Sequence, residues 1–183
     1  MKKNNAGFSL VELIIAIAIL TVLTGVGAYG IGQLTGFRAR EAADKIASGL
    51  KENKIETLGK AKASGKMAFE LYKVGNDVFI RTVYDAGMAT ESYSNPEKIN
   101  DGKITVWVGE KRGNATFHST TLRILRESTP FKIYFNRSTG ALCDASGADI
   151  DYNPVIRVKS GRKEYDVEVI SKTGKVISDT QKK

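Results

Sequence analysis

The side chains that could carry out catalysis are sparse and scattered in this sequence. His118 is the only histidine and Cys143 the only cysteine, so a Ser-His-Asp or Cys-His mechanism would lack a supporting motif. One thiol can form neither an intramolecular disulfide nor a zinc cluster. Asp144, Asp149 and Asp151 lie in an expected flexible stretch without EF-hand spacing, and no phosphate-binding loop, dinucleotide fingerprint or HExxH motif occurs. We therefore expect no enzyme, no metal site and no cofactor.

The most unusual titratable residue is a single acid at the edge of an apolar segment. Leu13 to Phe37 contains no charged side chain, and Glu12 stands immediately before this run. An acid near the start of a membrane helix costs about 2.5 to 3.5 kcal/mol on insertion scales and normally needs a partner. No cationic side chain close by in the sequence supplies that partner.

The uncharged run is long enough to cross a bilayer as a helix. A removable secretory signal would be shorter and would be cut after its apolar core. Lys2 and Lys3 precede the run, whereas Arg38 and Arg40 after it are offset by nearby acids, and this bias puts the N-terminus in the cytoplasm. The sequence therefore predicts a single-pass membrane helix over residues 8–37, with the remaining chain outside.

Beyond this run, the spacing of apolar residues predicts more helix and then strands. An amphipathic continuation over residues 38–64 is indicated by apolar positions at helical spacing: Ala39, Ala42, Ala43, Ile46, Ala47 and Leu50. Alternating patterns predict strands near 67–74, 77–84, 104–108, 131–135, 156–158, 165–169 and 176–177. Ala86 to Gly102 is expected to form a variable surface loop. The predicted fold class is α+β, with a mostly antiparallel β-sheet head over residues 65–183.

A short leader with two lysines precedes Gly7-Phe8-Ser9-Leu10-Val11-Glu12 and the apolar run. This arrangement resembles the cleavage and methylation motif of type IV prepilins and type II secretion pseudopilins. The resemblance implies that prepilin peptidase removes residues 1–7, cuts between Gly7 and Phe8, and N-methylates Phe8. It also implies that Glu12 pairs with the amino group of Phe8 on a neighbouring subunit during assembly. The alternative is a plain membrane anchor whose Glu12 reaches the interface.

The last third of the chain contains the strand pattern FKIYFNRSTG (residues 131–140), PVIRV, EYDVEVI and TGKVI. This pattern is similar to the head of the GspH/FimT group of minor pseudopilins. It implies a pilin-like structural subunit, a minor pilin or pseudopilin, of a type IV pilus or type II secretion filament. Such a subunit resides in the inner membrane and then in the filament. The implied partners are prepilin peptidase, other pilin subunits, membrane lipid, and the inner-membrane assembly platform with its ATPase.

The C-terminal strands are rich in basic residues. Some FimT-like minor pilins bind DNA through a basic C-terminal region, and by that resemblance Arg162 and Lys163 are candidate nucleic-acid contacts. Acids interleave with these cations, which favours a solvated charged face. Two alternatives therefore stay open beside a purely structural subunit: a DNA- or ligand-binding minor pilin used in DNA uptake or adhesion, and a membrane-anchored enzyme whose helix only tethers it.

Overall fold

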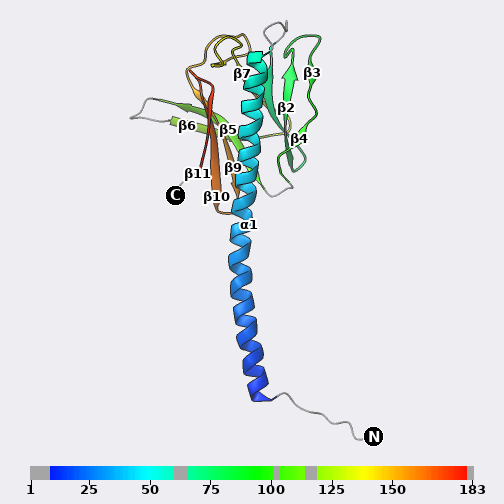
Figure 1. The fold of residues 1–183 in the computed structure, drawn as a ribbon, viewed down its shortest axis with the longest axis vertical. Coiled ribbons are helices and arrows are strands. Elements are labelled where there is room, and N and C mark those ends of the chain that lie inside the picture. Colours follow the sequence, from blue (N-terminus) through cyan, green and yellow to red (C-terminus); the bar gives the residue numbers. More distant parts are fainter. Residues whose placement is uncertain (1–8, 60–65, 101–103, 114–118, 181–183) are drawn as a thin grey trace.

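A long helix carries a β-rich head at its C-terminal half (Figure 1). The computed structural model describes residues 9–59, 66–100, 104–113 and 119–180; of residues 26–35, 119, 120 and 180 it describes the backbone alone. Helix α1 (Leu10–Gly59) has 50 residues and so extends about 75 Å at 1.5 Å per residue. Its N-terminal half projects from the head as a stalk, defined here as residues 10–35. The fold is α+β with antiparallel sheets, as predicted.

The upper half of α1 is built to pack against the head. Its buried positions recur at alternating intervals of three and four residues, which places them on one face of the helix. This series consists of Gly36, Ala39, Ala43, Ile46, Leu50, Asn53 and Thr57, and Ala42 and Ala47 beside it are buried as well. This face contacts strands of both sheets described below. Helix α1 includes residues 38–59 of the expected amphipathic helix, and residues 60–64 of that expectation lie outside the described residues.

One antiparallel sheet has the strand order β3-β2-β1-β7-β8, with β4 also pairing with β2. Its strands are β1 (Ala68–Val74), β2 (Asp77–Tyr84), β3 (Ser92–Tyr93), β4 (Glu97–Lys98), β7 (Phe131–Phe135) and β8 (Leu142–Cys143). The β1–β2 turn contains Gly75 at a φ of 60°, a left-handed conformation that glycine adopts readily. Most of the described part of the loop expected from Ala86 to Gly102 is irregular, but β3 and β4 pair with β2 within it and Ile99 is buried.

The other antiparallel sheet has the strand order β11-β10-β9-β5-β6. Its strands are β5 (Thr105–Arg112), β6 (Ser119–Ile124), β9 (Asn153–Ser160), β10 (Lys163–Ile170) and β11 (Lys175–Thr180). Four of these strands were predicted from alternation. Strand β6 was not, because its sequence STTLRI is largely polar and it forms an edge of the sheet. The head therefore contains two sheets where the sequence analysis described one.

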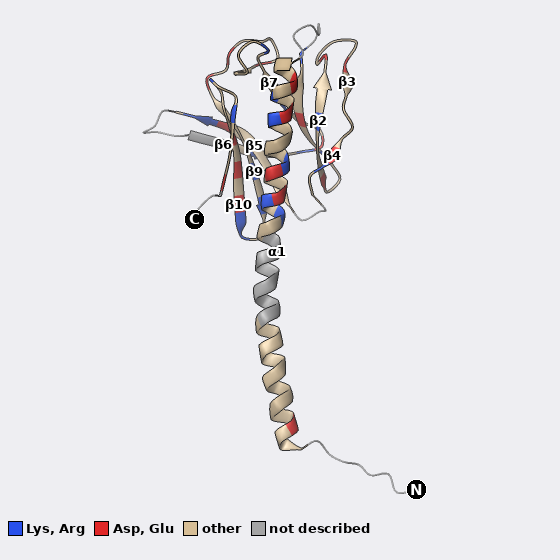
Figure 2. Cartoon of the chain, viewed as in Figure 1, with Lys and Arg blue, Asp and Glu red and all other residues tan. Residues whose placement is uncertain are grey.

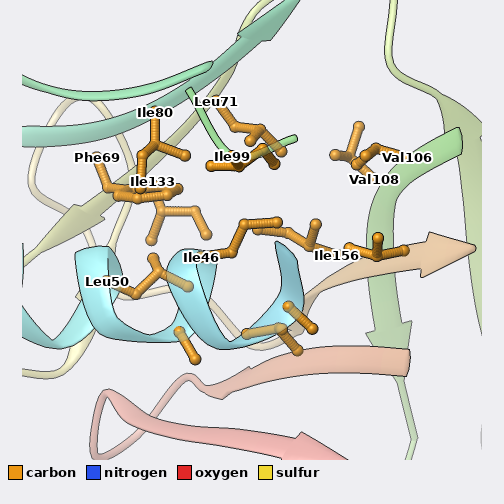
Figure 3. Packing of buried hydrophobic residues seen from close by; sticks show 14 of the residues in the cluster. Ile46, Leu50, Phe69, Leu71, Ile80, Ile99, Val106, Val108, Ile133 and Ile156 are labelled. Carbon is orange, nitrogen blue, oxygen red and sulfur yellow. The ribbon is translucent and has the colours of Figure 1, made fainter. Parts of the chain in front are cut away.

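The hydrophobic core lies where α1 meets the two sheets (Figure 3). Ile46 and Leu50 of α1 are fully buried in the same cluster as side chains from both sheets. Those labelled in the close-up are Phe69, Leu71, Ile80 and Ile133 of the first sheet, Val106, Val108 and Ile156 of the second, and Ile99. Because burying one such side chain contributes about 1.5 to 3 kcal/mol, the upper helix is an integral part of the head.

Two turns join the sheets near the C-terminal end of α1. The Lys54 ammonium donates a hydrogen bond of 2.8 Å to the carbonyl of Thr173, in the β10–β11 turn. Gly174 of that turn has a φ of 60°, and a Cβ placed on it would lie 1.9 Å from the carbonyl oxygen of Gly140. Gly140 follows β7 in the first sheet, so the close approach fixes one sheet against the other.

Candidate functional site

The described lower part of the stalk presents apolar side chains on every side. Ten large ones are between 53% and 75% exposed: Leu10, Val11, Leu13, Ile14, Ile15, Ile17, Ile19, Leu20, Val22 and Leu23. They occur at nearly consecutive positions, so the apolar surface surrounds the helix and is not confined to one face. An exposed apolar surface of this kind marks a region that contacts protein or membrane in its working state.

The hydroxyl groups in this part of the stalk bond to their own helix. Thr21 donates to the carbonyls of Ile17 and Ala18 at 3.0 and 2.8 Å. Thr24 donates in the same way to the carbonyls three and four residues before it, at 3.1 and 2.8 Å. Because these donors are already satisfied, both threonines can enter an apolar environment without the cost of an unpaired hydroxyl. Glu12 is left as the only charged side chain from residue 10 to residue 25 (Figure 2).

Glu12 lies exposed in the first turn of α1, at the foot of the stalk. The amide of Leu13 donates to the carbonyl of Ser9 at 3.1 Å, so Ser9 is the N-cap and Glu12 is the third helical residue. Ser9 and Glu12 thus have the spacing of a capping box, a signal readable in the sequence that our sequence analysis missed. Along the described helix, the first cation after Glu12 is Arg38, about 39 Å away at 1.5 Å per residue.

The other predicted processing residues cannot be placed beside Glu12. Gly7 and Phe8 lie outside the described residues, as does the lone histidine, His118. Glu12 is thus the only member of the predicted Gly7, Phe8 and Glu12 set with a described environment. Across the described parts of the chain, no helix is both long enough and apolar enough to cross a membrane.

The candidate nucleic-acid contacts lie at the base of the head. Arg162 and Lys163 are exposed and follow Gly161, whose φ of 59° makes the β9–β10 turn. The Lys163 Cγ atom would lie 3.2 Å from a Cβ atom placed on Gly36 of α1. The turn therefore rests against α1 where the stalk meets the head, and Figure 2 shows the basic end of β10 beside the helix there.

Cations farther along the same strands are paired with acids. Arg157 donates to both carboxylate oxygens of Asp166 at 2.7 and 2.8 Å, and this bonding raises the pKa of its guanidinium. The Lys159 ammonium lies 2.9 Å from a Glu164 carboxylate oxygen. These cross-strand pairs produce the mixed, solvated face that the interleaved sequence predicts. They leave little uncompensated positive charge on the body of the sheet.

The first sheet contains a charged cluster that the sequence did not predict, because the cluster depends on the register of three strands. Glu70 of β1 is only 2% exposed and faces Arg81 of β2 and Lys132 of β7 across the sheet. Its carboxylate accepts a hydrogen bond from Arg81 and lies 3.5 Å from the Lys132 ammonium. The Arg81 guanidinium also stacks on Tyr93, 3.8 Å from the ring centroid. The two cations thus compensate the charge of the buried Glu70, and this cross-strand pairing favours one register of the three strands.

A groove of about 270 Å³ between α1 and the β2–β4 edge contains carboxylates. Its lining includes Glu52, Glu56, Glu97 and Ser94. The Ser94 hydroxyl oxygen accepts a hydrogen bond from the Thr82 amide at 2.9 Å, so it serves the loop structure. Within the described residues no group of three His, Cys, Asp or Glu side chains is arranged to hold a metal ion.

The remaining candidate residues of the sequence analysis are engaged in structure. Cys143 is buried, and burial raises the pKa of its thiol, which lowers its reactivity as a nucleophile. The Asp144 carboxylate accepts hydrogen bonds from the Ser146 hydroxyl and from the backbone amides of residues 146–148, and these bonds lower its pKa. The stretch expected to be flexible is therefore a hydrogen-bonded turn.

The described residues combine an exposed apolar segment in the lower stalk, a lone acid at its foot and several cross-strand ion pairs in the head. Residues 2–28 match a family model described as the prokaryotic N-terminal methylation motif. The match supports a type IV pilin-like protein, a substrate of prepilin peptidase that assembles with other pilins. It covers the N-terminal segment and the first part of α1, not the head. A search of curated proteins and a search of solved structures found no match.

Proposed function

We propose that this chain is a minor pilin or pseudopilin of the GspH/FimT kind, a structural subunit of a type IV pilus or a type II secretion filament. The observation that carries the proposal is the stalk, with ten large apolar side chains 53% to 75% exposed and one acid at its foot. In a filament, the helices of neighbouring subunits would cover this surface. Full burial of one such side chain from water contributes about 1.5 to 3 kcal/mol, so even partial covering of ten favours assembly strongly.

Before assembly, the same segment would hold the precursor in the inner membrane. The uncharged run from Leu13 to Phe37 extends about 36 Å as a helix, against a hydrocarbon thickness of about 30 Å. The head would lie outside the cytoplasm, and the assembly platform with its ATPase would lift the subunit from the bilayer. The self-bonded threonines of the stalk suit both environments because neither bilayer nor filament core supplies water.

Glu12 would set the position of each subunit in the filament. In the proposed contact, its carboxylate pairs with the positively charged amino group of Phe8 on a neighbouring subunit, in low dielectric. Removing one member of a buried ion pair costs about 3 to 5 kcal/mol, because the remaining charge is left unpaired. The capping-box spacing of Ser9 and Glu12 gives a competing local explanation for the acid, and the test must separate the two.

The substitution Glu12→Gln removes the charge and keeps a side chain that can act in a capping box. We expect it to leave processing intact and to reduce incorporation into filaments more than a hundredfold. The matched variant Ser9→Ala removes the capping hydroxyl and keeps the charge, so it should assemble nearly as well as wild type. Incorporation is measured as the ratio of the variant in sheared filaments to the variant in membranes.

Mass spectrometry of the mature N-terminus accompanies both variants, because a cleavage defect would mimic an assembly defect. We expect N-methylated Phe8 as the first residue in all three proteins. If Glu12→Gln assembles as well as wild type, or if Ser9→Ala fails equally, the pairing role of Glu12 is wrong. A wild-type chain that still begins at Met1 in the assembled or membrane state would refute the filament-subunit proposal itself.

A further inference from the structure

Exposed cations of the head lie at the level where the uncharged run of α1 ends. Gly36 is buried beside Lys163, and the contact between them fixes the β9–β10 turn against this point of the helix. The next two residues of α1 are Phe37, which is 67% exposed, and Arg38, which is also exposed. The basic turn and the first charged residue after the apolar run therefore share one level at the base of the head.

Among the described residues, these cations differ from their neighbours in having no acidic partner. Arg40 and Lys45 of α1 lie 3.7 and 3.2 Å from acids one turn away, and Lys159 pairs with Glu164. Within the described residues, no carboxylate pairs with the base collar, which we define as Arg38, Arg162 and Lys163. Because the neighbouring cations Arg40, Lys45 and Lys159 are paired with acids, the base collar forms a local positive surface next to the top of the stalk.

We propose that the base collar binds the phosphate headgroups of anionic phospholipid while the stalk is in the membrane. The inference rests on the membrane stage of the proposed function. The run from Leu10 to Phe37 spans about 40 Å, close to the thickness of a bilayer with its headgroup regions, so Arg38 would reach the outer headgroups. Phe37 would lie at the interface, where aromatic residues are favoured.

The side-chain chemistry of the collar suits this position. The aliphatic part of Lys163 packs along α1 at Gly36, and its exposed ammonium can reach outward, as lysines at membrane interfaces do. Each cation close to an anionic membrane surface strengthens binding about fivefold. Two cations on the β9–β10 turn and one on the helix would thus hold the head in a preferred orientation on the bilayer before the subunit is extracted.

The location favours lipid over DNA as the ligand of Arg162 and Lys163. A duplex bound at the collar would occupy the space of the bilayer surface around the stalk. Farther along the same strands, Arg157 and Lys159 are committed to carboxylates, so they do not extend the collar into a longer phosphate-binding track. The test below therefore includes a DNA duplex as the alternative ligand.

The test uses the full chain in phospholipid nanodiscs made of phosphatidylcholine alone or with added phosphatidylglycerol. Hydrogen exchange of the peptide that contains the β9–β10 turn is followed by mass spectrometry. We expect a several-fold slower exchange in the anionic discs, and loss of the difference in about 1 M salt, where screening acts over about 3 Å. Arg162→Gln with Lys163→Gln should abolish the difference.

The matched control neutralises Lys172 of the β10–β11 turn and Lys175, the first residue of β11, at the opposite end of β10. It changes the net charge equally and should keep the slow exchange in anionic discs. Equal exchange in the two kinds of disc would overturn the lipid inference, and it would leave the filament assay of Glu12→Gln unaffected. Protection by a short DNA duplex but not by phosphatidylglycerol would overturn it in favour of nucleic acid. Failure of the chain to enter discs would overturn it together with the membrane stage.

Discussion

The two halves of α1 should respond in opposite ways to the same substitution. Ile46 is fully buried in the core, where it packs with residues of both sheets, whereas Ile15 is 54% exposed on the stalk. Ile46→Ala should lower the free energy of unfolding of the head by about 2 to 5 kcal/mol, the range for large-to-small changes in a core. Ile15→Ala should change it by less than about 0.5 kcal/mol.

These free energies correspond to a measurable difference in melting temperature. For a protein of this size, 1 kcal/mol shifts Tm by about 2 to 4 °C, so Ile46→Ala should lower Tm by about 4 to 20 °C. The assay is thermal unfolding of the full chain in detergent, followed by the fluorescence of Trp107. That side chain is partly buried in β5 and is the only tryptophan, so its signal reports on the head.

Filament incorporation provides the second readout. Ile15→Ala should reduce incorporation while leaving Tm unchanged, because in the proposed filament the helices of neighbouring subunits would cover its side chain. Ile46→Ala should leave the stalk surface as it is and act through head stability. Equal Tm shifts for the two variants, or an unchanged Tm for Ile46→Ala, would refute the division of α1 into a packed half and an uncovered half.

Two further predictions concern the turns of the head. Gly174→Ala should lower the stability of the head more than Gly75→Ala. Both glycines have a φ of 60°, a conformation that costs another residue about 1 to 2 kcal/mol. Only at Gly174 would the new Cβ also meet a backbone carbonyl, that of Gly140. Similar Tm losses for the two variants would contradict the close approach of the turns. Asp144 should titrate below the ordinary aspartate pKa of about 3.9 in an NMR titration, because the Ser146 hydroxyl and nearby amides bond to its charged form. Its stabilising contribution is complete above that ordinary pKa and is lost as pH falls through the lowered value, and an ordinary pKa would show that the turn does not form in solution.

Much of the architecture followed from local patterns. The period of apolar residues, which each segment carries by itself, predicted the β2 strand, the helix around Ile46 and the strands near the C-terminus. Local patterns did not predict the strand β6 or the short strands β3 and β4, because their sequences are polar or brief and only neighbouring strands stabilise them. The burial of Ile99 within an expected loop has the same cause.

The features of the candidate site also separate into local sequence patterns and tertiary contacts. The uncharged run, the position of Glu12 and the cleavage and methylation motif are properties of consecutive residues, so the sequence alone determined them, and it also contained the Ser9 capping signal. Only the tertiary structure decided that Lys163 lies against Gly36 and that Glu70 lies between Arg81 and Lys132. Those contacts join segments far apart in the chain, and the packing of sheets and helix that brings them together is not encoded in any local spacing.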